Sequence, residues 1–122
     1  MNSRLSDRAA DHVAPIDPAP LLGDWINYDA GSRNIASLTI AQDAEALVLR
    51  ITGWGEATAS PFALTTAGGE ALAFRAAYDF GFANIAILAY LNKRLLVVDA
   101  YTTFHDDSGR SSYFVRDHFY LR

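Results

Sequence analysis

The sequence predicts an all-β protein, an eight-stranded antiparallel up-and-down β-barrel, on three observations. From Leu21 onward, short segments rich in β-forming residues recur about every dozen residues. The segments between them are rich in Gly, Asp and Asn, which favour turns. These links are too short for parallel crossovers, so neighbouring strands are expected to be antiparallel. Closing eight such strands into a barrel removes both exposed sheet edges.

We expect strands over residues 22–28, 33–41, 46–54, 58–65, 70–79, 82–91, 94–104 and 112–121. An open sandwich of the same strands is the alternative fold. The barrel domain is predicted to cover residues 21–122. Residues 1–20 are predicted to form a flexible tail, because Pro15, Pro18 and Pro20 interrupt regular structure there.

Composition narrows the classes of function. The chain has 122 residues, a net charge of −4 and no cysteine. The charge is spread without a basic stripe, so nucleic-acid binding is not expected. The sequence contains no long apolar run, so a membrane span is not expected. The N-terminal residues do not resemble a secretory signal. The absence of cysteine excludes disulfides and fits a cytoplasmic protein.

No metal or cofactor is expected. The three His residues do not stand at metal-ligand spacing. The stretch Asp106–Arg110 lacks the remaining ligands of a calcium loop and predicts a hairpin turn. The glycine pairs are not followed by a helix, so they do not predict a phosphate-binding loop.

Alternation along each strand separates two faces. The more apolar face is expected inside and consists of Leu47, Leu49, Ile51, Leu72, Phe74, Ala76, Tyr78, Ile85, Ile87, Ala89, Leu91, Leu96, Val98, Ala100 and Thr102. The other face still carries Val48, Leu88, Leu95, Val97 and Phe114. Exposed apolar surface of this kind marks an interface, so a homo-oligomer is expected.

The register of the last hairpin follows from matching apolar residues with apolar residues. The strand that carries Leu96 to Thr102 then pairs its inner residues with Tyr113, Val115, Asp117, Phe119 and Leu121. Asp117 is the charged exception inside. The opposite face gathers Asp99, Tyr101, Arg116 and His118, where Asp99 can pair with Arg116 or His118.

The stretch Gly23-Asp24-Trp25, with Asn27 and then Gly31-Ser32, resembles the first strand and turn of the avidin family, in the calycin group with the lipocalins. In that family a G-x-W opens an eight-stranded barrel, and the Asn and Ser that follow contact the ligand. An Asp on the last strand also contacts it, and Asp117 falls on the matching strand. This chain has one extra residue before Gly31 and lacks the several later Trp residues of avidin pockets, so biotin is not the expected ligand. The C-terminal segment from Thr102 is similar to the ending of small bacterial barrel proteins.

The predicted function is binding of a small, largely apolar molecule in the lumen, since a few polar groups in an apolar cavity are typical of such sites. The predicted ligand-binding residues are Trp25, Asn27, Ser32, Asn34, Phe74, Tyr78, Thr102, Tyr113 and Asp117. Packing in the barrel floor is the preferred role of Trp25, and Asp117 could instead bond a tyrosine or the backbone. An inside-out barrel is the rival placement; its lining would suit an anion and would consist of Arg50, Arg75, Asp99, Tyr101, Arg116 and His118.

The alternative function is a cofactor-free cyclase or isomerase. Asp117 would act as an acid or base together with Tyr78 or Tyr113, because a buried carboxylate is suited to proton transfer. The resemblance supports this alternative, since other calycin-like barrels act as cyclases in bacterial biosynthesis. A structural module with a lumen filled by side chains is the third possibility.

Overall fold

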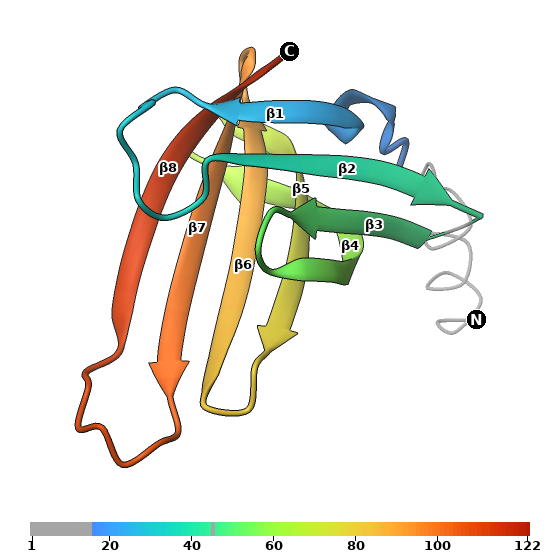
Figure 1. Cartoon of the computed structure of the whole chain (residues 1–122). Helices are drawn as coiled ribbons and strands as arrows, with labels where there is room; N and C mark the ends of the chain where they lie inside the picture. The colour runs from blue at the N-terminus through green and yellow to red at the C-terminus, as the bar shows by residue number, and fades with distance from the viewer. Residues whose placement is uncertain (1–15, 45) are drawn as a thin grey trace, which may run out of the picture.

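The computed structural model describes residues 16–44 and 46–122, and this part of the chain forms one closed antiparallel barrel (Figure 1). Its strands are β1 (Gly23–Asn27), β2 (Ser37–Asp43), β3 (Ala46–Ile51), β4 (Gly55–Thr66), β5 (Gly69–Asp79), β6 (Ala83–Asn92), β7 (Leu95–Phe104) and β8 (Tyr113–Leu121). Each strand pairs with its neighbours in sequence, and β1 closes the barrel against β8 through Trp25 opposite Leu121 and Asn27 opposite Phe119. The predicted fold class is confirmed, and the open sandwich is wrong.

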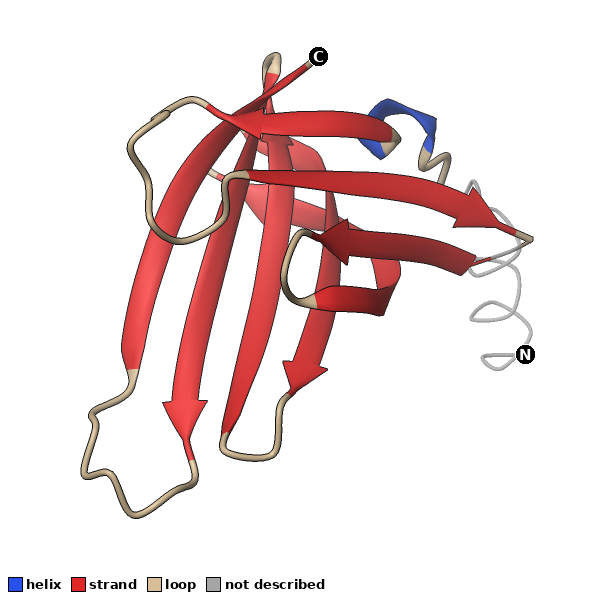
Figure 2. Cartoon of the chain, in the orientation of Figure 1, coloured by secondary structure: helices blue, strands red, loops and turns tan. Residues whose placement is uncertain are grey.

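Strands and their turns make up nearly all of the described chain, as Figure 2 shows. The one helical turn among the described residues is the short 3-10 helix η1 (Ala19–Leu21). It includes the last two residues of the predicted tail, whose first fifteen residues lie outside the described part of the chain.

Three predicted strand boundaries differ from the structure by three or four residues, and the others by at most two. The strand predicted from residue 33 begins only at Ser37, because residues 28–36 form a loop. The strand predicted over 46–54 ends at Ile51, and β4 begins at Gly55, where φ is 90°. A positive φ suits glycine, which has no Cβ to clash with the backbone, so the chain reverses here. β4 then pairs with β3 through its first residues and with β5 from Ser60 onward.

The predicted inner face forms the core. The buried cluster includes Leu49, Phe74, Ile87, Val98 and Phe119. The predicted register of the last hairpin is confirmed, with Leu96 opposite Phe119, Val98 opposite Asp117, Ala100 opposite Val115 and Thr102 opposite Tyr113.

The inside-out placement is wrong. Its charged residues lie on the outer surface, where Arg50 forms an ion pair with Glu56 and Arg116 with Asp99. Val97 also belongs to the outer face, but unlike the charged residues it is buried, with only 1% of its surface exposed. It stands between Tyr90 and His118 in the register of the outer face. The outer surface of the barrel therefore buries some apolar side chains of its own.

One end of the barrel is closed by η1. Leu21 is fully buried, and its carbonyl accepts a hydrogen bond of 2.9 Å from the indole Nε1 of Trp25. Because the strands alternate in direction, the connections after β1, β3, β5 and β7 all lie at the opposite end. The connections after β5 and β7 project at the bottom of Figure 1.

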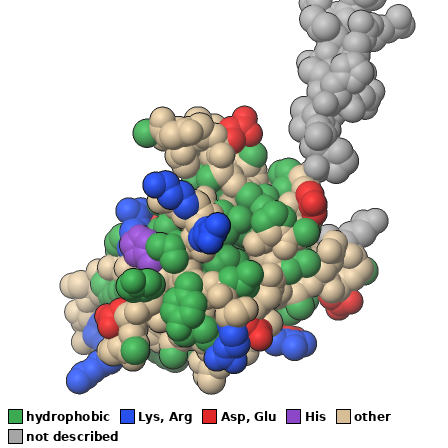
Figure 3. Space-filling model, turned by 90° about the horizontal axis from the view of Figure 1, so that it is seen from above, with side chains coloured by type: hydrophobic (Ala, Val, Ile, Leu, Met, Phe, Trp, Pro, Cys, Tyr) green, Lys and Arg blue, Asp and Glu red, His purple; other side chains and the backbone are tan. Residues whose placement is uncertain are grey.

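The surface also carries apolar side chains. The view from above, in Figure 3, shows hydrophobic side chains gathered in the middle of that face, with Lys and Arg around them. Residues 16–44 and 46–122 contain no helix long and apolar enough to cross a membrane.

Candidate functional site

The end of the barrel opposite η1, which we call the mouth, contains a cavity of about 340 Å³. Its lining comes from all four connections at this end and from the strands that enter them: Arg33, Asn34, Trp54, Phe80, Phe82, Ala83, Ile85, Thr102, Phe104, Arg110 and Tyr113. Pockets for small molecules have volumes of roughly 300–1,000 Å³, so the mouth has the size of a small-ligand site.

Aromatic rings form a continuous series at the mouth. Tyr78, Phe80 and Phe82 follow one another at alternate positions, and their rings stack with centroids 5.8 Å and 6.4 Å apart. The ring of Trp54 meets those of Tyr78 and Phe80 edge-on, at 5.5 Å and 6.2 Å. Exposure rises from 5% at Tyr78 to 51% at Phe82. The series therefore leads from the packed interior out to solvent.

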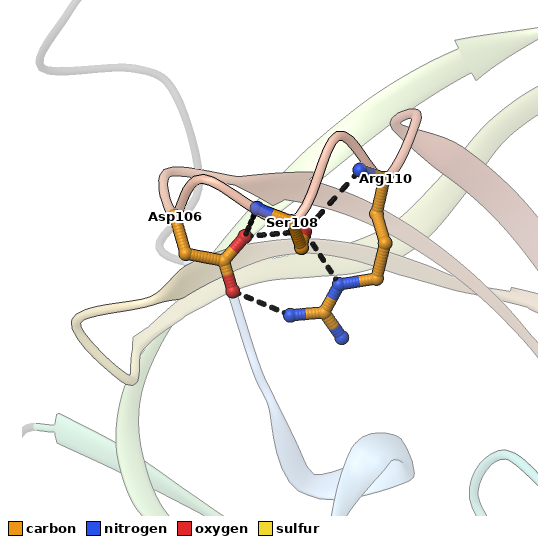
Figure 4. A network of polar contacts seen from close by, with 3 residues as sticks. All are labelled: Asp106, Ser108 and Arg110. Atoms are coloured by element: carbon orange, nitrogen blue, oxygen red, sulfur yellow. Dashed lines mark hydrogen bonds and ion pairs between the residues drawn. The ribbon is translucent and has the colours of Figure 1, made fainter.

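A basic side chain is fixed beside these rings. The guanidinium of Arg110 lies 4.0 Å from the ring centroid of Phe104 and 5.8 Å from that of Phe82. It donates hydrogen bonds to Asp106 Oδ2 at 2.6 Å and to Ser108 Oγ at 2.9 Å (Figure 4). Hydrogen bonds from Ser108 and Arg110 hold the pKa of the Asp106 carboxyl below its ordinary value. The segment predicted as a simple hairpin turn thus holds a cation in place at the mouth.

Tyr78 closes the inner side of the mouth. Its hydroxyl donates to the carbonyl of Gly55 at 2.9 Å, and the carbonyl of Leu49 lies 3.4 Å away. Burial raises the pKa of Tyr78 to about 12, and the nearby charge of Glu56 adds to the effect. Tyr78 is therefore neutral at physiological pH and bonded to the backbone.

Asn27 organises the loop of residues 28–36. It is 4% exposed; its Nδ2 donates to the Ile35 carbonyl, and its Oδ1 accepts from the Asp29 amide, both at 2.8 Å. Within the loop, Ser32 Oγ accepts a bond of 3.3 Å from the Asn34 amide. Of these predicted residues, Asn34 reaches the cavity lining, while Asn27 and Ser32 position the loop that carries it.

The remaining predicted residues lie deeper in the barrel. Trp25 and Phe74 are 2% and 0% exposed, within the packed core. Asp117 stands opposite Val98 on the inner face, and its Oδ2 is buried without a hydrogen-bond partner among the described residues. Asp117 therefore lies on the predicted inner face, in the same row of side chains as Phe74.

The three predicted catalytic residues do not share one row. The register runs from Tyr78 through Ile85 and Thr102 to Tyr113, so the two tyrosines belong to one inner row at the mouth. Asp117 lies four residues farther along β8 than Tyr113, about 13 Å along the strand. Tyr113 and Thr102 line the mouth, whereas Asp117 lines a separate, smaller pocket beside Asn27, Tyr28 and Asp29.

The sequence interpretation missed Arg33, Trp54, Phe80, Phe82, Phe104 and Arg110, all of which line the cavity. Most of them fall in or beside segments that had been assigned to turns. A signal was present, because aromatic residues continue the alternation of β5 past its end, at Tyr78, Phe80 and Phe82. Aromatic residues within turn segments are therefore the pattern that marks this mouth.

Comparisons with models of protein families, with curated proteins and with solved structures find no match for this chain. The closed eight-stranded antiparallel barrel is compatible with the calycin group that the sequence resembles. No group of three or more His, Asp or Glu side chains within residues 16–44 and 46–122 is arranged to hold a metal ion.

Proposed function

We propose that this protein binds a small, largely apolar molecule at the mouth of its barrel. One observation carries the proposal: a cavity of about 340 Å³ is walled by the partly exposed aromatic residues Trp54, Phe80, Phe82, Phe104 and Tyr113. Aromatic surface left in water is unfavourable, at roughly 25 cal/mol for each Å². A ligand that covers these rings removes that cost, which gives the mouth its affinity.

The packed interior leaves no room for a ligand below the mouth, which is why we place the ligand at the mouth itself. Leu49, Phe74 and Ile87 are at most 3% exposed, so the barrel below the mouth is filled by side chains. In this proposal the ligand contacts Asn34, Thr102 and Tyr113 among the residues predicted from sequence. Trp25 and Phe74 pack in the core, and Asn27 positions the loop that carries Asn34.

The rim favours a ligand whose polar end is negatively charged. Arg33 and Arg110 both line the cavity, and the Arg110 guanidinium lies 4.0 Å from the ring centroid of Phe104. Guanidinium groups recognise carboxylates and other oxyanions through paired hydrogen bonds. An apolar body among the rings and an acidic group at the arginines would satisfy both parts of the mouth. The proposal takes the protein as a calycin-like binder in the cytoplasm, in line with its cysteine-free sequence.

Titration with anilinonaphthalene sulfonate, an aromatic anion that fluoresces in apolar sites, tests the proposal. The matched variants are Phe82→Asp at the mouth and Tyr120→Asp on the outer surface, since the two rings are 51% and 43% exposed. We expect Phe82→Asp to weaken binding at least roughly tenfold and Tyr120→Asp to leave it within about twofold. The reverse pattern, or equal effects, would reject the mouth as the binding site.

A cofactor-free cyclase or isomerase is the second candidate, favoured by the buried Asp117 Oδ2 that has no partner among the described residues. Buried polar atoms are normally bonded, so such an oxygen is suited to accept a proton from a substrate. Native mass spectrometry of the freshly purified protein and of Asp117→Asn would reveal any bound molecule. An isomerase leaves the mass unchanged, so the released compounds are compared by chromatography. Different compounds from the two proteins would support catalysis, and the same compound from both would reject it.

A further inference from the structure

A second hollow of the described chain lies on the outside of the barrel. It has a volume of about 800 Å³ and runs over the outer faces of β4 to β8. Its floor is low because Ala77 and Ala86 stand opposite each other in the register. Phe62, beneath the guanidinium of Arg75 at 4.5 Å, forms one wall. Tyr101 and Phe114, 49% and 54% exposed, form the other.

We propose that this outer groove is the interface of a symmetric homodimer whose twofold axis runs parallel to β6. Such an axis places β6 over the partner's β6, β5 over the partner's β7, and β4 over the partner's β8. Two sheets packed face to face in this way lie about 10 Å apart. In an interface of this symmetry the same surface of both copies must complement itself.

Side-chain size is complementary about this axis. One row of the outer face runs Ala77, Ala86, Tyr101 and Phe114 from β5 to β8. The axis through β6 places Ala77 against the partner's Tyr101, and Tyr101 against the partner's Ala77. The ring of Tyr101 therefore occupies the space above an alanine of the other copy, and this contact occurs twice in each dimer. The groove of one copy is therefore filled by the aromatic wall of the other.

Charge is complementary about the same axis. The next row runs Arg75, Leu88, Asp99 and Arg116. Leu88 meets the partner's Leu88, and Arg75 meets the partner's Asp99. Arg75 makes no ion pair within residues 16–44 and 46–122. Asp99 bonds Arg116 through both oxygens, at 2.6 Å and 2.9 Å, and each oxygen retains a lone pair for a second donor.

The face is large enough for a stable dimer. Five strands at a spacing of about 4.8 Å, each about ten residues long, cover on the order of 800 Å². A standard protein interface buries about 800 Å² on each partner. The row from Ala77 to Phe114 supplies apolar contacts, and the row from Arg75 to Arg116 supplies polar contacts on both sides of Leu88.

Sedimentation equilibrium of the full chain, with one variant and its control, tests the interface. Leu88→Arg places a charge on the axis, and Val48→Arg places the same charge at a half-buried position on the outer face of β3. We expect the native chain and Val48→Arg to be dimeric, and Leu88→Arg to dissociate at least roughly 100-fold more readily. A monomeric native chain, or a dimer that Leu88→Arg leaves intact, would overturn the proposal.

Crosslinking tests the direction of the axis without relying on the folding of a charged variant. The chain has no cysteine, so single cysteines react without background. Packed sheets are too far apart for a disulfide, and a short thiol-to-thiol reagent is needed. We expect Leu88→Cys to crosslink with itself. Ala77→Cys should crosslink only when mixed with Tyr101→Cys. Crosslinking of Val48→Cys, or of Ala77→Cys alone, would contradict an axis along β6.

Discussion

The two tryptophans of the chain stand at opposite ends of the barrel, and they differ in burial and in hydrogen bonding. Trp25 at the closed end is 2% exposed, and its indole N–H is bonded to the Leu21 carbonyl. Trp54 at the mouth is partly exposed, and its ring stands nearly perpendicular to those of Tyr78 and Phe80. One end is completed by the chain's own helical turn, whereas the other end leaves aromatic surface for something else to cover.

This difference separates stability from binding. Residues that fill space at the closed end contribute packing and hydrophobic free energy to the folded state. The aromatic residues at the mouth lose less packing and hydrophobic free energy on unfolding, because part of their surface is already in water. Substitutions at the closed end should therefore lower stability, whereas substitutions at the mouth should act on affinity.

The largest expected effect is that of Trp25→Ala. Removing a fully buried indole leaves a cavity and costs about 3–5 kcal/mol of the free energy of unfolding. Trp54→Ala should cost less, about 1–2 kcal/mol, because its ring is only partly buried, and it should weaken binding of anilinonaphthalene sulfonate. Urea unfolding followed by circular dichroism measures both. Equal losses of stability would break the distinction between the two ends.

Asn27→Ala should have the next largest effect and should lower both the stability of the fold and the affinity for the probe. It leaves the Ile35 carbonyl and the Asp29 amide without their partner, at a cost of about 1–3 kcal/mol. It also releases the loop that carries Arg33 and Asn34, so probe affinity should fall. Ser32→Ala, which removes one long hydrogen bond, is the control and should change stability by less than about 0.5 kcal/mol. A stable Asn27→Ala variant with native affinity would show that Asn27 does not position the loop.

Tyr78 predicts a pH dependence. Its pKa in the folded protein is raised from 10.0 to about 12, so the folded state holds the phenol proton more tightly than the unfolded state does. The resulting stabilisation is fully present below pH 10 and is lost as the pH rises from about 10 to about 12; it is on the order of 2 kcal/mol.

The Tyr78 contribution is measured as the difference between the native chain and Tyr78→Phe, by unfolding at a series of pH values. The difference should be constant below pH 10 and should decrease above it. A difference that does not depend on pH would mean that the Tyr78 hydroxyl is not buried between the carbonyls of Gly55 and Leu49.

Asp117→Leu should have the smallest effect on stability and the opposite sign. It removes a buried carboxylate oxygen that lacks a partner among the described residues and adds apolar contact beside Val98. We expect an increase of about 1 kcal/mol in the free energy of unfolding. Asp107→Leu, in the exposed turn after β7, is the control and should be neutral. A loss of stability on Asp117→Leu would show that Asp117 is bonded in the folded protein.

The sequence predicted the barrel and its faces well, and the mouth poorly, for a physical reason. In a strand, alternation alone determines which face a side chain occupies, so Val98, Asp117 and Phe119 could be placed from their spacing. In a loop, side-chain direction depends on turn geometry and on distant hydrogen bonds. The place of Arg110 depends on Asp106 and Ser108, and that of Asn34 depends on Asn27, so neither followed from periodicity.

The indole N–H signals of the ¹⁵N-labelled protein test the contrast between the ends most directly. The chain has two tryptophans and so gives two such signals. We predict that the Trp25 signal resists exchange in deuterium oxide and stays in place when anilinonaphthalene sulfonate is added. The Trp54 signal should exchange rapidly and shift on titration. A shift of the Trp25 signal, or an unmoved Trp54 signal while the probe binds, would contradict ligand binding at the mouth.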